Sequence, residues 1–371
     1  MDPVLLAREL VRLDTTNPPG GEERALRYLA QLLSAGGLEV ALDTFGPGRG
    51  SLVARLNPGR GPALCLAGHV DTVPVGREAW AVDPFAGLVQ DGRLHGRGAS
   101  DMKGGVAAMC AAALALAREG FGGALAVYVF GGEESGCEGS FHALADPALR
   151  GQPGAVVVAE PTRNRPLVGH KGALWLACET RGRTAHGSMP ELGDNALYKL
   201  VDAVARVRAL DLGPAHAHLG PPTLSVNTLQ AGENVNSVPD RARATIDIRS
   251  VPGQDNAALT ALVRAAAGEQ AEVRALLDLP PVWTAPDHPW LARACAALAP
   301  LLDRPPGVET VQFFTDAAAF RHVCPEVPML ILGPGDPAQA HRTDEWCATA
   351  DIHAATAMYL ALARDWDAAP D

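Results

Sequence analysis

Residues 63–71 have the sequence ALCLAGHVD, and this short stretch already indicates the fold class. Five apolar or small residues, Ala63–Ala67, form an unbroken run, and His69 and Asp71 follow it directly. A strand that is buried on both faces of a parallel sheet is apolar without alternation. In open α/β sheets, ligands bind beyond the carboxyl ends of such strands. The stretch therefore predicts a buried parallel strand whose end carries functional polar side chains.

Three further runs have the same apolar character, and helical patterns lie between or after them. The runs are Ala124–Phe130, Ala155–Ala159 and Pro328–Leu332. The helical patterns cover Glu22–Ala35, Lys103–Glu119 and Asp351–Arg364. Apolar strands that alternate with helices are typical of an α/β domain with a mostly parallel sheet covered on both faces.

The middle of the chain has a different pattern. Strand-like segments occupy Val168–Thr180, Thr223–Gln230, Ala242–Arg249 and Ala271–Leu277, and helical segments occupy Glu191–Leu210 and Gln254–Gly268. Their order is β-α-β-β-α-β, the ferredoxin-like plan of an α+β domain. Three prolines, Pro280, Pro281 and Pro286, mark its end. We therefore predict a catalytic domain formed by residues 1–168 and 283–371, with an inserted domain at residues 169–282.

Length and composition narrow the class of protein. A chain of 371 residues is long enough for two domains. The formal net charge of −11 disfavours a nucleic-acid partner, because phosphate binding needs a basic surface. The N-terminus lacks a signal peptide's apolar core, and the apolar runs are too short to cross a bilayer. Seven scattered cysteines fit a reducing compartment. We expect a cytoplasmic protein with no nucleic-acid or membrane partner.

Five separated residues form a candidate ligand set for metal ions: His69, Asp101, Glu134, Glu160 and His341. Four of them follow apolar runs, and Asp101 lies in residues 96–105, just before an Ala-rich helical pattern. Two imidazoles and three carboxylates suit a pair of divalent ions that share one carboxylate. Burying so many carboxylates without cations would cost on the order of several kcal/mol per group. The set predicts a two-metal site.

Two further acidic residues stand beside these ligands. Asp71 lies two residues beyond His69, within reach of its imidazole ring, and is predicted to orient it. Glu133 precedes Glu134, and adjacent side chains in extended backbone diverge, so one can bind metal while the other faces the substrate. Glu133 is therefore the predicted general base, which takes a proton from a water activated by the metal pair.

Competing motifs are absent or incomplete. Residues 96–101 begin like a dinucleotide-binding motif, but Asp101 stands where Gly or Ala is required, and no convincing strand precedes them. The sequence contains neither a GxSxG nucleophile elbow nor an HExxH zinc motif. A binding protein that has lost catalytic activity stays open as an alternative of a different class, although every predicted ligand and the predicted base are present.

The sequence resembles the M20 metallopeptidases and deacylases, which include acetylornithine deacetylase, succinyl-diaminopimelate desuccinylase, aminoacylase-1 and carboxypeptidase G2. The resemblance covers nearly the whole chain, with the motifs in the family's order. They are GHVDTVP (68–74), GRGASDMKGG (96–105), GEESG (132–136), EPT (160–162), GRTAHGSMP (182–190), NSVP (236–239), DIR (247–249), and Ala340-His341 followed by Glu345.

The resemblance implies how the ligands divide between the two ions. Asp101 would bridge them, His69 and Glu160 would complete one site, and Glu134 and His341 the other. Zinc would be the usual metal, with cobalt or manganese as substitutes. The Asp101–Met102 peptide would be cis.

The resemblance also assigns roles outside the ligand set. The inserted domain would be a lid and dimerisation domain of a homodimer. His186 would reach the partner subunit's active site and stabilise the oxyanion of the tetrahedral intermediate. Arg249, Asn236 and Thr315 would contact the substrate, with Arg249 suited to bidentate capture of a carboxylate.

The substrate prediction depends on one loop. Residues 332–345, LGPGDPAQAHRTDE, are similar to the same loop of acetylornithine deacetylase. The favoured reading is therefore a deacetylase of N-acetyl amino acids, ornithine-like, in arginine biosynthesis. A succinyl-diaminopimelate desuccinylase is the next alternative, and a carboxypeptidase G2-like enzyme or a dipeptidase follows.

Overall fold

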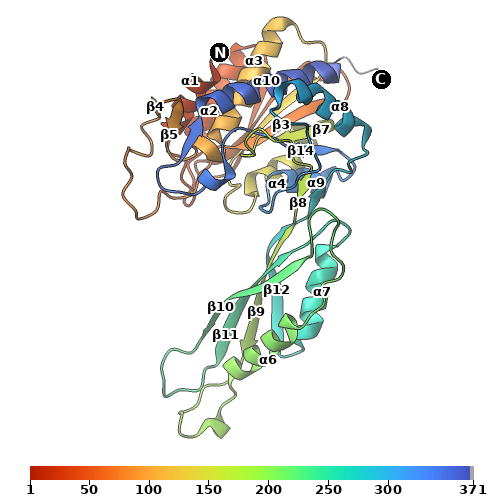
Figure 1. Ribbon diagram of the computed structural model, residues 1–371. Helices are drawn as coiled ribbons and strands as arrows, with labels where there is room; N and C mark the ends of the chain where they lie inside the picture. The colour runs from red at the N-terminus through yellow and green to blue at the C-terminus, as the bar shows by residue number, and fades with distance from the viewer. Residues whose placement is uncertain (368–371) are drawn as a thin grey trace. The chain divides into compact units, whose positions relative to one another are not determined.

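The computed structural model describes residues 1–367, and the chain divides into two compact units (Figure 1). Unit 1 contains Met1–Gly169, Trp283–Thr310 and the described chain from Thr315 onward. Unit 2 contains His170–Val282 together with the short segment Val311–Phe314. The inserted domain was predicted at residues 169–282, so unit 2 begins one residue later and gains four residues from a distant loop.

Unit 1 contains a six-stranded sheet that is parallel over most of its width. Its order is β1-β2-β6-β3-β7-β14, formed by Glu39–Gly46, Arg49–Leu56, Leu125–Phe130, Ala63–His69, Pro153–Val158 and Met329–Ile331. Strands β6, β3, β7 and β14 run parallel to one another, whereas β1 and β2 form an antiparallel hairpin, and β2 pairs with β6 in the antiparallel direction. The predicted mixed α/β fold with a largely parallel sheet is confirmed, and the edge hairpin is an addition that the sequence patterns did not reveal.

Helices cover both faces of this sheet (Figure 1). One layer contains α1 (Pro3–Val11), α3 (Gly104–Glu119), α8 (Pro289–Leu298) and α10 (Thr349–Asp367), which pack on one another. The other face carries α4 (Glu138–Ala145) and α9 (Ala317–Val323), and α9 places Phe320 edge-on against Tyr128 of β6. The helices α2 (Glu23–Ala35) and α5 (Pro147–Arg150) complete the unit.

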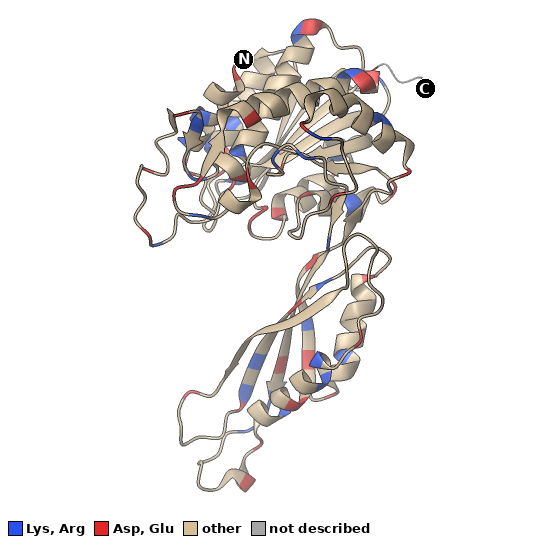
Figure 2. Cartoon of the chain, viewed as in Figure 1, with Lys and Arg blue, Asp and Glu red and all other residues tan. Residues whose placement is uncertain are grey.

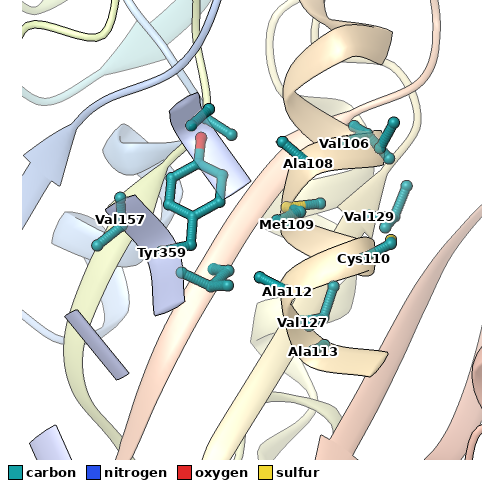
Figure 3. Close-up of a cluster of buried hydrophobic side chains, with 14 of the residues drawn as sticks. Val106, Ala108, Met109, Cys110, Ala112, Ala113, Val127, Val129, Val157 and Tyr359 are labelled. Carbon is teal, nitrogen blue, oxygen red and sulfur yellow. The ribbon is translucent and has the colours of Figure 1, made fainter. Parts of the chain in front are cut away.

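The helix α3 is the centre of the core. Figure 3 shows Val106 and Cys110 of α3 near Val127 and Val129 of β6. Alanines on α3 let the neighbouring helix α10 approach closely, since small side chains reduce the distance between helix axes. The helix 99–119 is long and apolar enough to span a membrane, but 89% of its most apolar window is buried inside the protein. Its apolar character is explained by burial in the core.

Unit 1 also contains a small three-stranded sheet of order β15-β5-β4. Its strands are Trp346–Ala348, Arg93–His95 and Leu88–Gln90. The pairing of β15 with β5 brings residues 345 and 96 together, with Gly96 N donating to the Glu345 carbonyl at 2.9 Å. The remaining short elements are η1 (Ala99–Lys103), β8 (Gly169–His170), η2 (Pro190–Leu192), β13 (Val282–Trp283), η3 (Ala299–Leu301) and η4 (Pro337–Gln339).

Unit 2 has the predicted order of elements, β-α-β-β-α-β. Its antiparallel sheet has the order β10-β11-β9-β12, formed by Thr223–Ala231, Arg241–Arg249, Ala173–Arg181 and Ala271–Leu279. Helices α6 (Ala196–Arg208) and α7 (Asn256–Ala267) cover one face, and their residues Leu200, Val207 and Val263 form its core with β9 and β11. The other face carries charges of both signs, including Arg243 and Arg274 near Glu179 (Figure 2).

Candidate metal centre

Neighbouring parallel strands bring the predicted ligands to one edge of the sheet. His69 is the last residue of β3 and pairs in register with Phe130, the last residue of β6. Glu133 and Glu134 follow β6 after two glycines, and Glu160 follows β7 on the other side of β3. Because the carboxyl ends of parallel strands meet at one edge, these side chains converge.

Asp101 and His341 reach the same place from loops, and the five residues form two overlapping groups. His69, Asp101 and Glu160 form one group, and Asp101, Glu134 and His341 form the other; within each, the donor atoms all lie within 4.8 Å of one another. Asp101 belongs to both groups. Its Oδ1 lies 3.4 Å from His69 Nε2, and its Oδ2 lies 3.4 Å from His341 Nε2.

These distances fit divalent cations. Ligands about 2.0–2.2 Å from a tetrahedral zinc ion lie about 3.3–3.6 Å apart, and His341 Nε2 lies 3.1 Å from Glu134 Oε2. His69 Nε2 lies 3.8 Å from Glu160 Oε1, which is looser. The Nε2 atom of His69 is also buried with no hydrogen-bond partner. Buried polar atoms usually have a hydrogen-bond partner. A buried imidazole nitrogen that faces carboxylates and has no such partner is suited to bind a metal ion.

The negative charges of the clustered carboxylates also favour bound cations at this edge of the sheet. Burial raises the pKa of Glu160 well above its usual value, and the neighbouring charge of Asp101 adds to the increase. The Asp101 carboxyl is also buried, but contacts with His341 and His69 outweigh burial and lower its pKa. The carboxylates of Asp101 and Glu134 raise the pKa of His341 to about 10. Three acidic groups so close together require compensating positive charge, and two divalent ions would supply it.

The two groups differ in access to solvent. His69 and Glu160 are buried, whereas the His341 side chain keeps 55% of its surface exposed. His341 also has a left-handed backbone, with φ of 63°. The group of Asp101, Glu134 and His341 is therefore the more open of the two.

Asp71 has a broader set of contacts than the sequence predicted. His69 Nδ1 lies 2.9 Å from the Asp71 backbone carbonyl and 3.5 Å from its carboxylate Oδ1. The carbonyl therefore accepts a hydrogen bond from Nδ1–H, which keeps the proton on Nδ1 and leaves Nε2 free to bind metal. The Asp71 carboxylate instead accepts hydrogen bonds from the backbone N–H groups of Glu133, at 3.1 Å, and Glu134, at 3.2 Å. It thus holds the turn that carries both glutamates.

Glu133 lies beside the metal-binding groups without being part of them. It is 6% exposed, and its Oε2 lies 3.9 Å from His69 Nε2. Burial raises its pKa well above the usual value, and nearby Glu160 adds to this, although His69 opposes it. Asp316 is also fully buried in this region, and burial raises its pKa to about 6. A carboxylate with a raised pKa is suited to accept a proton.

Asn17 is a site residue that sequence reasoning missed. Its amide Nδ2 donates to Asp71 Oδ2 and to Ser135 Oγ, both at 3.0 Å, and its side chain is buried. It therefore ties the N-terminal segment to the turn that carries Glu133 and Glu134. The only local signal is the polar-proline stretch TTNPPG at residues 15–20, which is typical of any loop.

The other predicted residues belong to neither group of metal-binding residues. Thr315 is buried in unit 1, where its hydroxyl accepts a hydrogen bond from Ala317 N at the start of α9. His186 and Asn236 belong to unit 2 and are exposed; they are neighbours, since Gly187 N donates to the Asn236 carbonyl at 2.7 Å.

Arg249 lies at the opposite end of unit 2 from His186. It ends β11 and forms an ion pair with Asp247, with Nε 2.9 Å from Oδ1. The His186 end of the sheet begins where Arg241 pairs with Arg181. The strand between Arg241 and Arg249 spans roughly 25 Å at the usual rise per residue. One small substrate molecule therefore cannot touch both ends of this sheet.

The chain belongs to the peptidase family M20/M25/M40, whose model matches residues 65–365. It is therefore a metal-dependent hydrolase of amide bonds. A succinyl-diaminopimelate desuccinylase from Methylobacterium sp. (strain 4-46) is 35% identical over 382 residues, covering 96% of this chain and 94% of that protein. A protein of the same name from Granulibacter bethesdensis is 33% identical over 380 residues, covering 97% of each.

Solved structures show the same fold at lower identity. An M20 family metallo-carboxypeptidase from Sulfolobus solfataricus superposes with a TM-score of 0.83 and 18% identity, covering 99% of both chains. A dinuclear metal-binding peptidase of the M20 family from Bacillus subtilis has a TM-score of 0.71 and 17% identity, covering 97% of this chain and 96% of that one.

The comparisons confirm the predicted family, fold class and hydrolase activity. They do not support acetylornithine deacetylase or arginine biosynthesis, which the loop at residues 332–345 had favoured; the relatives carry the name of the first alternative instead. Loop similarity over fourteen residues was weaker information than similarity over the whole chain. The predicted cis peptide between Asp101 and Met102 is present.

Proposed function

We propose that this chain is a desuccinylase that uses two divalent metal ions to hydrolyse the amide bond of an N-succinyl amino acid of the diaminopimelate type. The observation that carries the proposal is the pair of ligand groups that share Asp101. Relatives of matching length named succinyl-diaminopimelate desuccinylase support the choice of acyl group. Zinc, a cytoplasmic location and a homodimer stay predictions within this proposal.

The reaction adds one water across the amide and yields succinate and a free amine. When bound, the ions would lower the pKa of water and polarise the amide carbonyl. His69, Asp101, Glu134, Glu160 and His341 would hold the ions. Glu133 would take a proton from the attacking water and deliver it to the departing amine nitrogen, because its raised pKa suits both transfers. Asp71 and Asn17 would keep Glu133 in position through the hydrogen bonds described above.

Cationic residues of unit 2 support a substrate with several carboxylates. Arg249 can form two parallel hydrogen bonds with a carboxylate when it exchanges Asp247 for the substrate. Lys171 lies close to Arg249. Burial lowers the pKa of Lys171, and the positive charge of Arg249 lowers it further. Two neighbouring cations suit an anionic substrate even though the whole chain is acidic, because local fields dominate in a binding site.

His186 and Asn236 would serve the partner subunit's reaction. Both are exposed and lie at the end of unit 2 remote from Arg249. An imidazole that stabilises a developing oxyanion must sit within hydrogen-bonding distance of it. We therefore place His186 against the active site of a second copy, where its Nε2 would donate to the oxyanion while Nδ1 stays close to Ser188 Oγ, at 2.8 Å.

A substrate panel on metal-loaded protein tests the proposal. N-succinyl-diaminopimelate, N-acetylornithine and dipeptides would be compared by kcat/KM, with protein stripped by a chelator as control. We expect the succinyl substrate to be preferred at least about 100-fold, since unpaired polar groups in the site penalise the wrong acyl group. Faster turnover of N-acetylornithine or of a dipeptide would contradict the desuccinylase proposal. Full activity after complete metal removal would contradict the two-metal chemistry itself.

A further inference from the structure

The carboxylate of Glu345 is fully buried and accepts hydrogen bonds at both oxygens. Oε1 accepts from the backbone N–H groups of Ser100, at 2.8 Å, and Asp101, at 3.0 Å. Oε2 accepts from the backbone N–H of Gly98, at 2.9 Å, and from the Arg97 guanidinium, at 2.8 Å. Three backbone donors within four residues therefore converge on one side chain that lies about 245 residues away in the sequence.

This carboxylate connects the two loops that supply Asp101 and His341, two ligands of the more open group. Its donors lie in the segment that ends at Asp101, the residue shared by both ligand groups. Glu345 itself follows His341 by four residues in the same loop. Arg97 reinforces the connection, because its guanidinium also donates to the Arg342 carbonyl at 3.2 Å and to the Pro74 carbonyl at 3.3 Å.

The backbone of the segment that ends at Asp101 fits around the Glu345 carboxylate and depends on its hydrogen bonds. Gly98 has φ of 83°, a left-handed conformation in which a side chain would also meet Thr72. Ser100 is buried, and its hydroxyl reaches the Asp336 carbonyl, 3.2 Å away, in the loop that leads to His341. Without Glu345, three N–H groups would be left in a protein interior with no acceptor, and buried donors rarely stay unpaired. The segment would then have to move, and Asp101 would move with it.

We propose that Glu345 is a positioning residue that fixes Asp101 and His341 in the geometry needed to bind metal, with Arg97 as its partner. It touches neither group of ligand atoms, so it acts through the two loops. This inference rests on the metal-binding role proposed above for those ligands. Outer contacts of this kind typically change metal affinity by about 10–100-fold when they are removed.

Metal titration of apo-protein tests the proposal directly. Co²⁺ would be added to chelator-treated wild type, Glu345→Gln, Glu345→Ala and Arg97→Lys, with visible absorption reporting the ligand geometry and elemental analysis the stoichiometry. Thermal midpoints of the apo-proteins would report stability separately. Thr284→Val is the matched control, since Thr284 is buried in unit 1 and exchanges two hydrogen bonds with the backbone of Met329 at the start of β14, away from the ligands.

We expect Glu345→Ala to lower Co²⁺ affinity by about 10–100-fold and to change its absorption spectrum, with Glu345→Gln and Arg97→Lys intermediate. Thr284→Val should lower the thermal midpoint while leaving affinity and spectrum unchanged. If Glu345→Ala does not fold, Glu345→Gln is judged by the same criteria. Unchanged Co²⁺ affinity and spectrum in the folded Glu345 variants would overturn the proposal while leaving the metal centre intact. Wild-type protein that binds no metal would instead overturn the proposed function.

Discussion

The metal-binding edge of unit 1 and the end of unit 2 that carries His186 contrast in how their polar residues are held. At the edge of unit 1, His69, Asp71 and Glu160 are buried, and each is fixed by strand ends or by backbone hydrogen bonds. In unit 2, His186 and Asn236 are exposed and belong to irregular segments. Groups that must hold charge permanently need a rigid, preorganised setting. Groups that act on another chain or a mobile substrate need exposure.

The strongest way to break this comparison is to remove the ligand that both groups share. Asp101→Asn keeps the size of the side chain but replaces one carboxylate oxygen by an amide nitrogen and removes the negative charge. Since loss of an outer contact alone costs about 10–100-fold, we expect kcat/KM to fall by more than about 10⁴-fold and bound metal to fall below one ion per chain. Elemental analysis and a hydrolysis assay would measure both quantities. Retention of two ions with normal turnover would remove Asp101 from the centre.

The second test separates the base from the ligands. Glu133→Gln removes the proton acceptor but leaves all five ligand side chains in place, so metal content should stay at two ions. We expect kcat to fall by about 10³-fold, within the range that general-base catalysis contributes. Single-turnover kinetics on metal-loaded variant protein would measure the loss. A kcat within tenfold of wild type would assign the base to another group, of which buried Asp316 is the first candidate.

The third test concerns the exposed end of unit 2. His186→Ala should leave metal content unchanged and lower kcat by about 10²-fold, because one oxyanion donor is lost. Mixing this variant with Glu133→Gln under subunit exchange should restore about one quarter of wild-type activity. Half of randomly formed dimers are mixed, and one of the two sites in each mixed dimer is intact. If the mixture recovers no activity, His186 acts in the active site of its own chain and not in that of the partner subunit.

The fourth test addresses substrate capture. Arg249→Lys keeps the positive charge but loses the two-pronged geometry of the guanidinium. We expect KM for the succinyl substrate to rise by about tenfold with kcat little changed, as for an interaction that is equal in ground and transition states. Steady-state kinetics would measure the split. A fall in kcat with unchanged KM would place Arg249 at the reacting bond.

These residues were not equally predictable from the sequence. His69, Glu134 and Glu160 were predictable because each follows an apolar run, and parallel strands bring their carboxyl ends together. The β1–β2 hairpin was not, since β1 is a partly exposed edge strand without clear apolar alternation, and arginines stand on both sides of the buried run of β2. The roles of Asn17 and Glu345 arise from contacts 54 and 244–248 residues apart in the chain, which no local pattern records. The sequence also assigned the Asp71 carboxylate to the His69 ring, whereas the backbone carbonyl lies closer.

The smallest effect is expected at Asn17, which joins the N-terminal segment to the turn of Glu133 and Glu134. Asn17→Ala removes two donor contacts, but Asp71 keeps its two backbone donors, so the turn should stay formed. We expect the free energy of unfolding to fall by about 2 kcal/mol, as for a hydrogen bond to a charged group, and kcat to fall by only about threefold. Urea unfolding and steady-state kinetics would measure the two losses.

The isosteric variant Asn17→Asp sharpens that test, because it places a second carboxylate beside the buried Asp71. Repulsion between the two charges should make its activity loss clearly larger than that of Asn17→Ala. Equal losses would mean that removal of the amide donor, the one change that both variants share, accounts for the whole effect. In that case the Asn17 amide would hold the turn of Glu133 through its hydrogen bonds, and the contrast with the exposed end of unit 2 would lie in hydrogen bonding as well as in burial.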